Sequence, residues 1–306
     1  MALIAYRLDP GFLPNGGKGT VSIASAETNP VPSVVTPLSN GNEANVLSVL
    51  SNPSLTNVIM SGFIRDNGLD STLNRGCFYA CHNQQNDLTG IALIGHTMLL
   101  ETFADDAIQA FAALARKNPS PHLLMAEHNT VRQFWKNYSV SGEPPRLIHP
   151  ILFLQRHDQF KQPYSVEGLR LATRNDLEQV VRAQAAMAFE TSAVDPLTKD
   201  PNGFRERYLR RIEKNRVWVL MKKERLIFKA DVTAESSDVA YLEGVYVSPE
   251  ERGKGIGRSC LQAIGHTLLH RKKAIFLFVA QENTRLQSFY FSLGFTVGGH
   301  YDLLYF

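Results

Sequence analysis

The sequence has few of the features that mark several large classes of protein. Its 306 residues include only three cysteines, Cys77, Cys81 and Cys260. An odd and small number cannot form a disulfide framework and favours a reducing, cytoplasmic compartment. No apolar run approaches the ~18 residues that a membrane-spanning helix needs. The opening MALIAYRLDPGF lacks the charged and apolar regions of a secretory signal. We therefore expect no membrane partner.

The excess of positive over negative charge is also small. The formal net charge is +3, and residues 161–306 carry 22 Lys and Arg against 17 Asp and Glu, whereas residues 1–160 carry 10 against 12. A mildly basic carboxyl-terminal half suits an anionic small ligand, but it is too weak to indicate nucleic-acid binding. The cysteines and the nine histidines match no zinc or haem spacing, which predicts no metal. Cys77 and Cys81 are expected as buried or half-buried strand residues.

Composition divides the chain into three parts. Residues 28–42 are rich in Pro, Ser, Thr and Asn, which predicts a flexible extension over residues 1–42, with a short strand at residues 20–24. Alternating helical and strand patterns then predict a smaller α/β domain over residues 43–160 and an α/β (α+β) domain over residues 165–306, with a polar break between them. The patterns predict helices at residues 43–50, 103–117, 130–137, 175–190, 203–215, 257–270 and 284–293, and strands at residues 76–81, 88–94, 98–101, 123–126, 149–154, 168–172, 217–222, 226–234, 239–247, 274–279 and 295–306.

The most informative stretch is a glycine-rich turn between a predicted strand and a predicted helix. The strand ends in Val245-Tyr-Val, and Arg252-Gly-Lys-Gly-Ile-Gly257 opens the helix. Alternate glycines let the backbone approach a ligand, and the helix N-terminus adds free N–H groups and a positive dipole end. The spacing matches neither a P-loop nor a dinucleotide-binding turn. It predicts a pyrophosphate site, and the alternative is a tight turn without a ligand.

Two motifs resemble those of the GCN5-related N-acetyltransferase (GNAT) superfamily. Arg252-x-x-Gly-x-Gly257 after a Val-Tyr-Val strand is similar to the acetyl-CoA motif of that family. Asn283-x-x-Leu-x-x-x-Tyr290-x-x-x-Gly-Phe295 is similar to a second motif, with Leu286 in place of the usual alanine. The resemblance implies a GNAT fold for the carboxyl-terminal domain, with a mixed, mostly antiparallel sheet flanked by helices. The chain also resembles a bacterial two-domain subgroup that carries an uncharacterised amino-terminal domain.

The resemblance implies which residues would hold the donor. Backbone groups of Val245, Tyr246 and Val247 would pair with the pantetheine arm as an added strand does. Asn283 would contact the cofactor or the loop where two strands separate. The amides that would surround the pyrophosphate belong to Arg252, Gly253, Lys254, Gly255, Ile256, Gly257 and Arg258.

Acyl transfer to an amine needs a base, an oxyanion donor and an acid for the leaving thiolate. Tyr290 is the candidate acid because a phenol is protonated at neutral pH; its alternative is a packed core tyrosine. Glu243 is the candidate base, with an exposed strand carboxylate as its alternative. Asp231 is a second candidate base, otherwise a surface ion pair with Lys229 or Lys222. Gly244 suggests a bulge in the strand, and Glu190 is a further candidate for the acceptor pocket.

The sequence thus predicts an N-acetyltransferase that moves an acetyl group from acetyl-CoA to a primary amine by direct attack in a ternary complex. The alternatives are an acyl-CoA sensor without turnover and a transferase of another acyl group. The acceptor, a small molecule or a protein, is not identified by any residue, and a homodimer stays open. The amino-terminal domain has no clear motif, and a degenerate acyltransferase fold, a substrate-binding domain and a dimerisation surface are its alternatives.

Overall fold

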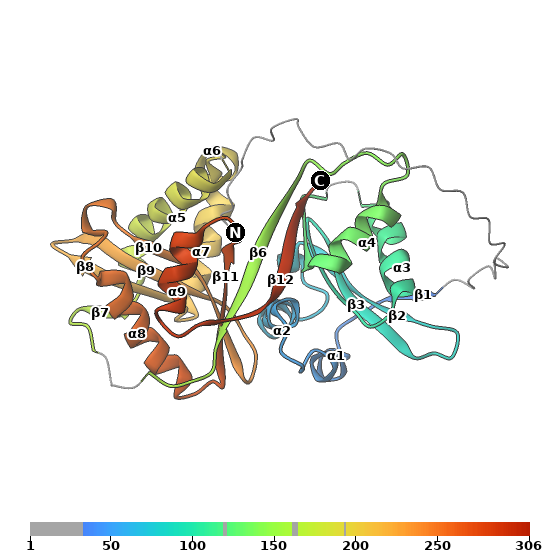
Figure 1. Ribbon diagram of the computed structural model, residues 1–306, viewed down its shortest axis with the longest axis horizontal. Helices are drawn as coiled ribbons and strands as arrows, with labels where there is room; N and C mark the ends of the chain where they lie inside the picture. Colours follow the sequence, from blue (N-terminus) through green and yellow to red (C-terminus); the bar gives the residue numbers. More distant parts are fainter. Residues whose placement is uncertain (1–32, 119–120, 161–164, 193) are drawn as a thin grey trace, which may run out of the picture.

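A single twelve-stranded sheet runs through the molecule (Figure 1). The computed structural model describes residues 33–118, 121–160, 165–192 and 194–306. The strand order is β1-β2-β3-β4-β5-β12-β6-β11-β10-β9-β8-β7. Most neighbouring strands are antiparallel, and helices cover the sheet, as the predicted fold class requires.

The amino-terminal half supplies six strands. Its elements are β1 (Val34–Pro37), α1 (Glu43–Val49), α2 (Leu55–Asn67), a 3-10 turn (Thr72–Asn74), β2 (Gly76–His82), β3 (Leu88–Gly95), β4 (Thr97–Thr102), α3 (Asp105–Ala115), β5 (Leu123–Glu127), α4 (His128–Tyr138) and β6 (Leu147–Arg156).

The carboxyl-terminal half supplies the other six strands. Its elements are β7 (Leu169–Leu171), a 3-10 turn (Arg174–Asp176), α5 (Leu177–Ser192), α6 (Pro196–Lys199), α7 (Pro201–Glu213), β8 (Val217–Lys222), β9 (Arg225–Glu235), β10 (Val239–Val247), a 3-10 turn (Pro249–Glu251), α8 (Ile256–Leu269), β11 (Ala274–Ala280), α9 (Thr284–Phe291) and β12 (Thr296–Tyr305).

The two halves repeat one order of elements. Each has a first strand, a helical segment, three antiparallel strands, a helix, a fifth strand, a helix and a last strand. In each half the fourth and fifth strands are parallel: β4 pairs with β5 from Thr97 and Leu123, and β10 pairs with β11 from Val239 and Ala274. Similarity between the halves is therefore visible in the topology, although the residues themselves do not reveal a repeat.

The last strands of the two halves are exchanged. β6 of the amino-terminal half pairs with β11 of the carboxyl-terminal half, whereas β12 pairs with β5. The two exchanged strands also pair with each other in the middle of the sheet, where His149 lies opposite Leu303. Because of this exchange, the two domains expected at residues 43–160 and 165–306 share one sheet, and each contains a strand that pairs with the other.

Helix α2 was not predicted from the sequence, and it joins the halves. Both its apolar and several of its polar side chains are buried, so it lacks the one-sided pattern that indicates a surface helix. Gly62 lies directly on β9, where a Cβ atom would come within 2.6 Å of Ala234 Cβ. At its carboxyl end, Asp66 accepts hydrogen bonds from both terminal nitrogens of Arg216. The helix therefore fixes one half against the other.

Two expectations about the amino-terminal half need correction. The extension expected over residues 1–42 ends earlier, because residues 34–37 form β1 and pair with β2 in the register Val35 to Cys81. Two β-branched valines favour this edge strand. The strand expected at residues 20–24 lies outside the described residues. Cys81 is buried as expected, but Cys77 is exposed near the start of β2, although both cysteines lie on the same face of the strand.

Candidate active site

The site begins where β10 and β11 separate. They pair only from Val239 to Tyr241 and from Ala274 to Phe276. Beyond this point β10 continues to pair with β9 alone, with Tyr246 opposite Lys229. One edge of the last residues of β10 is therefore open to an extended ligand, which could pair with the backbone as an added strand does.

The glycine-rich turn follows directly on β10. Gly253 has a φ of +78° and Gly255, the N-cap of α8, a φ of +82°. A Cβ atom at either position would meet nothing within 4 Å, so the left-handed backbone, and not crowding, is what favours glycine there. The first amides of α8 have no partner within the helix and point toward the turn. This is an arrangement that binds anions.

A groove of about 610 Å³ runs along the open strand and the turn. All of the predicted donor-binding residues except Lys254 line it: Val245, Tyr246, Val247, Arg252, Gly253, Gly255, Ile256, Gly257, Arg258 and Asn283. Lys254 instead donates a hydrogen bond from Nζ to Glu251, at 3.1 Å. Glu190 lines this groove as well, and not the acceptor pocket suggested for it.

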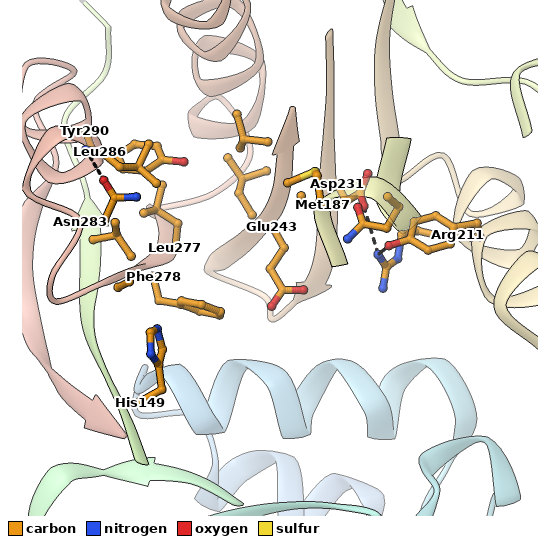
Figure 2. A pocket seen from close by; sticks show the side chains of 17 residues that line it. His149, Met187, Arg211, Asp231, Glu243, Leu277, Phe278, Asn283, Leu286 and Tyr290 are labelled. Carbon is orange, nitrogen blue, oxygen red and sulfur yellow. Dashed lines mark hydrogen bonds and ion pairs between the residues drawn. The ribbon is translucent and has the colours of Figure 1, made fainter. Parts of the chain in front are cut away.

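The two polar atoms of the Asn283 side chain have different surroundings. Its Oδ1 accepts a hydrogen bond of 2.9 Å from the Leu286 backbone amide and so caps α9. The nitrogen of the same side chain is turned toward the cavity (Figure 2). The side chain can therefore hold the helix and donate to a ligand at once.

A smaller cavity of about 200 Å³ adjoins the groove. The two share Met187, Val245, Asn283, Leu286 and Tyr290 as lining residues. Tyr290 is only 5% exposed and packs between the rings of Phe289 and Phe295. Burial raises the pKa of Tyr290 further above its usual value, so the phenol carries its proton at neutral pH. It stands where the contents of the two cavities would meet.

Glu243 lines the smaller cavity beside a bulge in β10. The register shifts between Glu243 and Tyr246, and Gly244 has a φ of +62°, which confirms the expected bulge. The carboxylate accepts a hydrogen bond of 2.6 Å from Tyr241 Oη at Oε1 and one of 3.1 Å from Thr233 Oγ1 at Oε2. Both of its oxygens are therefore engaged within the protein.

A buried lysine, expected from the sequence only as a surface partner of Asp231, contacts this bulge. Lys229 is 0% exposed and donates from Nζ to the Gly244 carbonyl at 2.9 Å, to Gln184 at 2.8 Å and to Asp231 at 3.0 Å. Burial lowers the pKa of Lys229, and the Asp231 carboxylate opposes that change. Asp231 also accepts from Arg211 at 3.1 Å. The expected surface ion pair of Asp231 is therefore a buried one, because α5 and α7 cover this face of β9 with Gln184 and Arg211.

Comparison with known proteins identifies the fold around this site. Residues 187–295 match the acetyltransferase (GNAT) family. The carboxyl-terminal half contains a GNAT domain. No curated protein matches the sequence closely enough to count as a relative. The bacterial two-domain subgroup stays a prediction.

Solved structures extend the similarity to both halves of the chain. An acetyltransferase of the GNAT family from Colwellia psychrerythraea covers 89% of this chain and 98% of its own, with a TM-score of 0.55 and 12% identity. A tandem GNAT protein from the clavulanic acid biosynthesis pathway covers 90% and 98%, with a TM-score of 0.55 and 14% identity. A Drosophila protein covers 89% and 98%, with a TM-score of 0.60 and 8% identity. At these identities the likeness concerns the fold alone.

The amino-terminal half also contributes a side chain to the pocket of the GNAT domain. His149, on the exchanged strand β6, is 6% exposed and lines the smaller cavity. Figure 2 shows its ring beside Phe278, across the cavity from Tyr290. The residue was missed because it belongs to the other half of the sequence. Its only signal is a polar position within the apolar strand LIHPILFL.

Other residues of the GNAT domain have structural tasks. Cys260 is buried on α8, and burial raises the pKa of its thiol to about 12, which agrees with packing and not with a nucleophile. Among the described residues, no three His, Cys, Asp or Glu side chains gather as a metal site. No helix in that part of the chain has both the length and the apolar character to cross a membrane.

Proposed function

We propose that the protein transfers an acetyl group from acetyl-CoA to a primary amine in a ternary complex. The observation that carries this proposal is the meeting of two cavities at Tyr290: a groove edged by the glycine-rich turn and a small pocket lined by polar side chains. The first suits a long anionic donor and the second a small acceptor. Tyr290 would stand at the reacting carbon between them.

The residues of the groove suit the donor chemically. Unpartnered amides at the start of α8 would face the pyrophosphate, and Arg252 and Arg258 add positive charge at the same end. The open edge of Val245–Val247 would pair with the pantetheine arm. The Asn283 amide nitrogen would donate to the donor where the strands separate.

The groups that react in the chemical step would come from both cavities. The amine nitrogen attacks the thioester carbonyl, and a backbone N–H near Val247 stabilises the oxyanion. Tyr290 gives its proton to the sulfur as the carbon–sulfur bond breaks. Glu243 is the carboxylate that we place beside the acceptor amine, where its charge attracts an ammonium group. The carboxylate of Glu243 therefore favours a cationic acceptor on its side of the pocket, whereas Asp231 and Arg211 pair with each other.

The first test is a calorimetric titration with acetyl-CoA. Gly255→Asp places a carboxylate and a strained backbone in the turn, where Gly255 has a φ of +82°. Losing two charge-assisted hydrogen bonds at 1.5–3 kcal/mol each predicts binding weaker by roughly 100-fold or more. Gly142→Asp is the matched control, because Gly142 has a φ of +74° and equally open surroundings outside the site.

The outcomes separate the proposed enzyme from its alternatives. Binding by the wild type and by Gly142→Asp, lost in a folded Gly255→Asp variant, supports the donor site. No binding by the wild type contradicts both the transferase and the acyl-CoA sensor. Binding of acetyl-CoA, without release of free CoA when any of a panel of primary amines is added, would favour the sensor.

A further inference from the structure

Among the residues that the structure describes, His149 is the one residue of the amino-terminal half that lines the smaller cavity, and it lies on the exchanged strand β6. We propose that Nε2 of His149 accepts the proton of the acceptor amine, so that the amino-terminal half completes the active site. This inference rests on the acetyl transfer proposed above. It gives the amino-terminal half a chemical role that its own sequence does not suggest.

The surroundings of the imidazole favour a free Nε2. Within the described part of the chain, this nitrogen is buried and has no hydrogen-bond partner. An unpaired polar atom in such a place costs about 1–3 kcal/mol, and a substrate donor would remove that cost. The other nitrogen, Nδ1, faces Glu282, with Oε1 at 3.7 Å. A carboxylate on that side places the ring proton on Nδ1 and leaves the lone pair of Nε2 directed into the pocket.

Charged groups on three elements decide whether the ring stays neutral. Burial lowers the pKa of His149, whereas Glu282 before α9 and Asp302 on β12 oppose that change. Asp302 is itself hydrogen-bonded to His128 of α4, with 2.8 Å between Oδ2 and Nδ1. Burial prevails, so the imidazole is neutral at the start of the reaction and able to accept a proton.

Glu243 suits this task less well than its position suggests. Both of its oxygens already accept hydrogen bonds, from Tyr241 and Thr233. Hydrogen bonds to a carboxylate stabilise its charged form and make it a weaker base. Glu243 therefore attracts the ammonium, and His149 takes the proton from it.

The step balances without a further reactant. The ammonium gives one proton to Nε2, and the neutral amine then attacks the thioester carbonyl to form the carbon–nitrogen bond. The carbon–sulfur bond breaks, and the thiolate takes the proton of Tyr290. Tyr290 regains a proton from the nitrogen of the new amide. The proton on His149 leaves past Glu282, whose side chain is 48% exposed.

Two amines of nearly equal size provide a direct test. Methylamine is almost wholly protonated at neutral pH and needs a base, whereas hydroxylamine is a much weaker base and is already neutral. We expect His149→Gln to lower acetylation of methylamine by about 100-fold. Acetylation of hydroxylamine, after subtraction of the uncatalysed rate, should change by less than a few-fold. His300→Gln is the matched control, because His300 is exposed on β12; both rates should stay within two-fold of the wild type.

Several results would overturn the proposal. Equal losses with both amines would mean that His149 only supports the structure, and no loss with either would mean that it takes no part. The same selective loss in Glu243→Gln, with His149→Gln unaffected, would assign the base to Glu243. Each of these results leaves acetyl transfer by the wild type intact and therefore contradicts the role of His149 alone.

A second measurement keeps the proposal testable if neither amine is acetylated. Nitrogen NMR of the wild type saturated with acetyl-CoA, assigned with His149→Gln, reports the protonation of each ring nitrogen. We expect a neutral ring at neutral pH, with the proton on Nδ1. A proton on Nε2, or an imidazolium, would overturn the proposal. Failure of acetyl-CoA to bind would instead contradict the proposed function.

Discussion

The two halves of the molecule have one topology but differ sharply at a single connection. In the carboxyl-terminal half, residues 248–255 lie between β10 and α8 and include the glycine-rich turn. In the amino-terminal half, only Phe103 and Ala104 separate β4 from α3, and Asp105 and Asp106 open that helix. Carboxylates at a helix N-terminus are favourable for the helix but repel a pyrophosphate. The amino-terminal half therefore shares the order of elements but lacks the glycine-rich turn on which the proposed donor site depends.

The strand registers allow the halves to be compared residue by residue. Parallel pairing starts at Thr97 in β4 and at Val239 in β10, which places Glu101 at the position of Glu243. The residue opposite each glutamate then differs: Ile91 faces Glu101, whereas Asp231 faces Glu243. One half packs an apolar side chain where the other buries charge. The buried carboxylate of Asp231 thus belongs to the half that holds the smaller cavity, which Asp231 lines.

The largest expected difference between the halves is in donor binding, which should be present in one and absent in the other. Calorimetry of the wild type with acetyl-CoA should give one site per chain. Replacing Asp105 and Asp106 together with asparagine should leave the affinity within two-fold, because α3 has no part in the donor groove. A stoichiometry of two would contradict the comparison.

The next difference is in stability. Asp231→Asn would leave the ammonium of Lys229, which is 0% exposed, without its carboxylate. Breaking a buried ion pair in this way costs about 3–5 kcal/mol in the free energy of unfolding. Ile91→Val, at the matching position, should cost about 0.5–1.5 kcal/mol. Urea unfolding of the two variants measures both costs, and similar losses would show that the buried charges have no special weight.

How much could be predicted from the sequence differs between residues that are close together in the chain and residues that come from distant segments. The residues of the proposed donor groove could be chosen from the sequence because most of them lie close together in the chain, in a turn where positive φ angles favour glycine. The residues of the smaller cavity could not all be chosen in this way, because the cavity combines Arg211 of α7, Asp231 of β9 and His149 of β6. Helix α2 was missed because a helix buried on most sides has no apolar stripe. The exchange of β6 and β12 depends on pairing across the whole chain, which no local pattern encodes.

The smallest expected effect concerns the pH dependence of Glu101, the counterpart of Glu243. Its Oε2 accepts hydrogen bonds from Ser54 at 3.0 Å and Thr56 at 3.1 Å, but burial outweighs these and raises the pKa of Glu101. A carboxyl group with a raised pKa in the folded state stabilises the protein at low pH, and this contribution is lost as pH rises through the folded pKa.

Glu101→Gln removes that titration while keeping the shape of the side chain. Thermal unfolding between pH ~4, near the pKa of an unfolded glutamate, and pH ~7 should show the variant gaining stability relative to the wild type as pH rises. Acetyl transfer should stay within two-fold of the wild type, because Glu101 is outside both cavities of the site. A variant that loses relative stability with rising pH would show that the charged form of Glu101 is favoured in the folded protein. The glutamate of the amino-terminal half would then resemble Glu243 in its electrostatics as well as in its place.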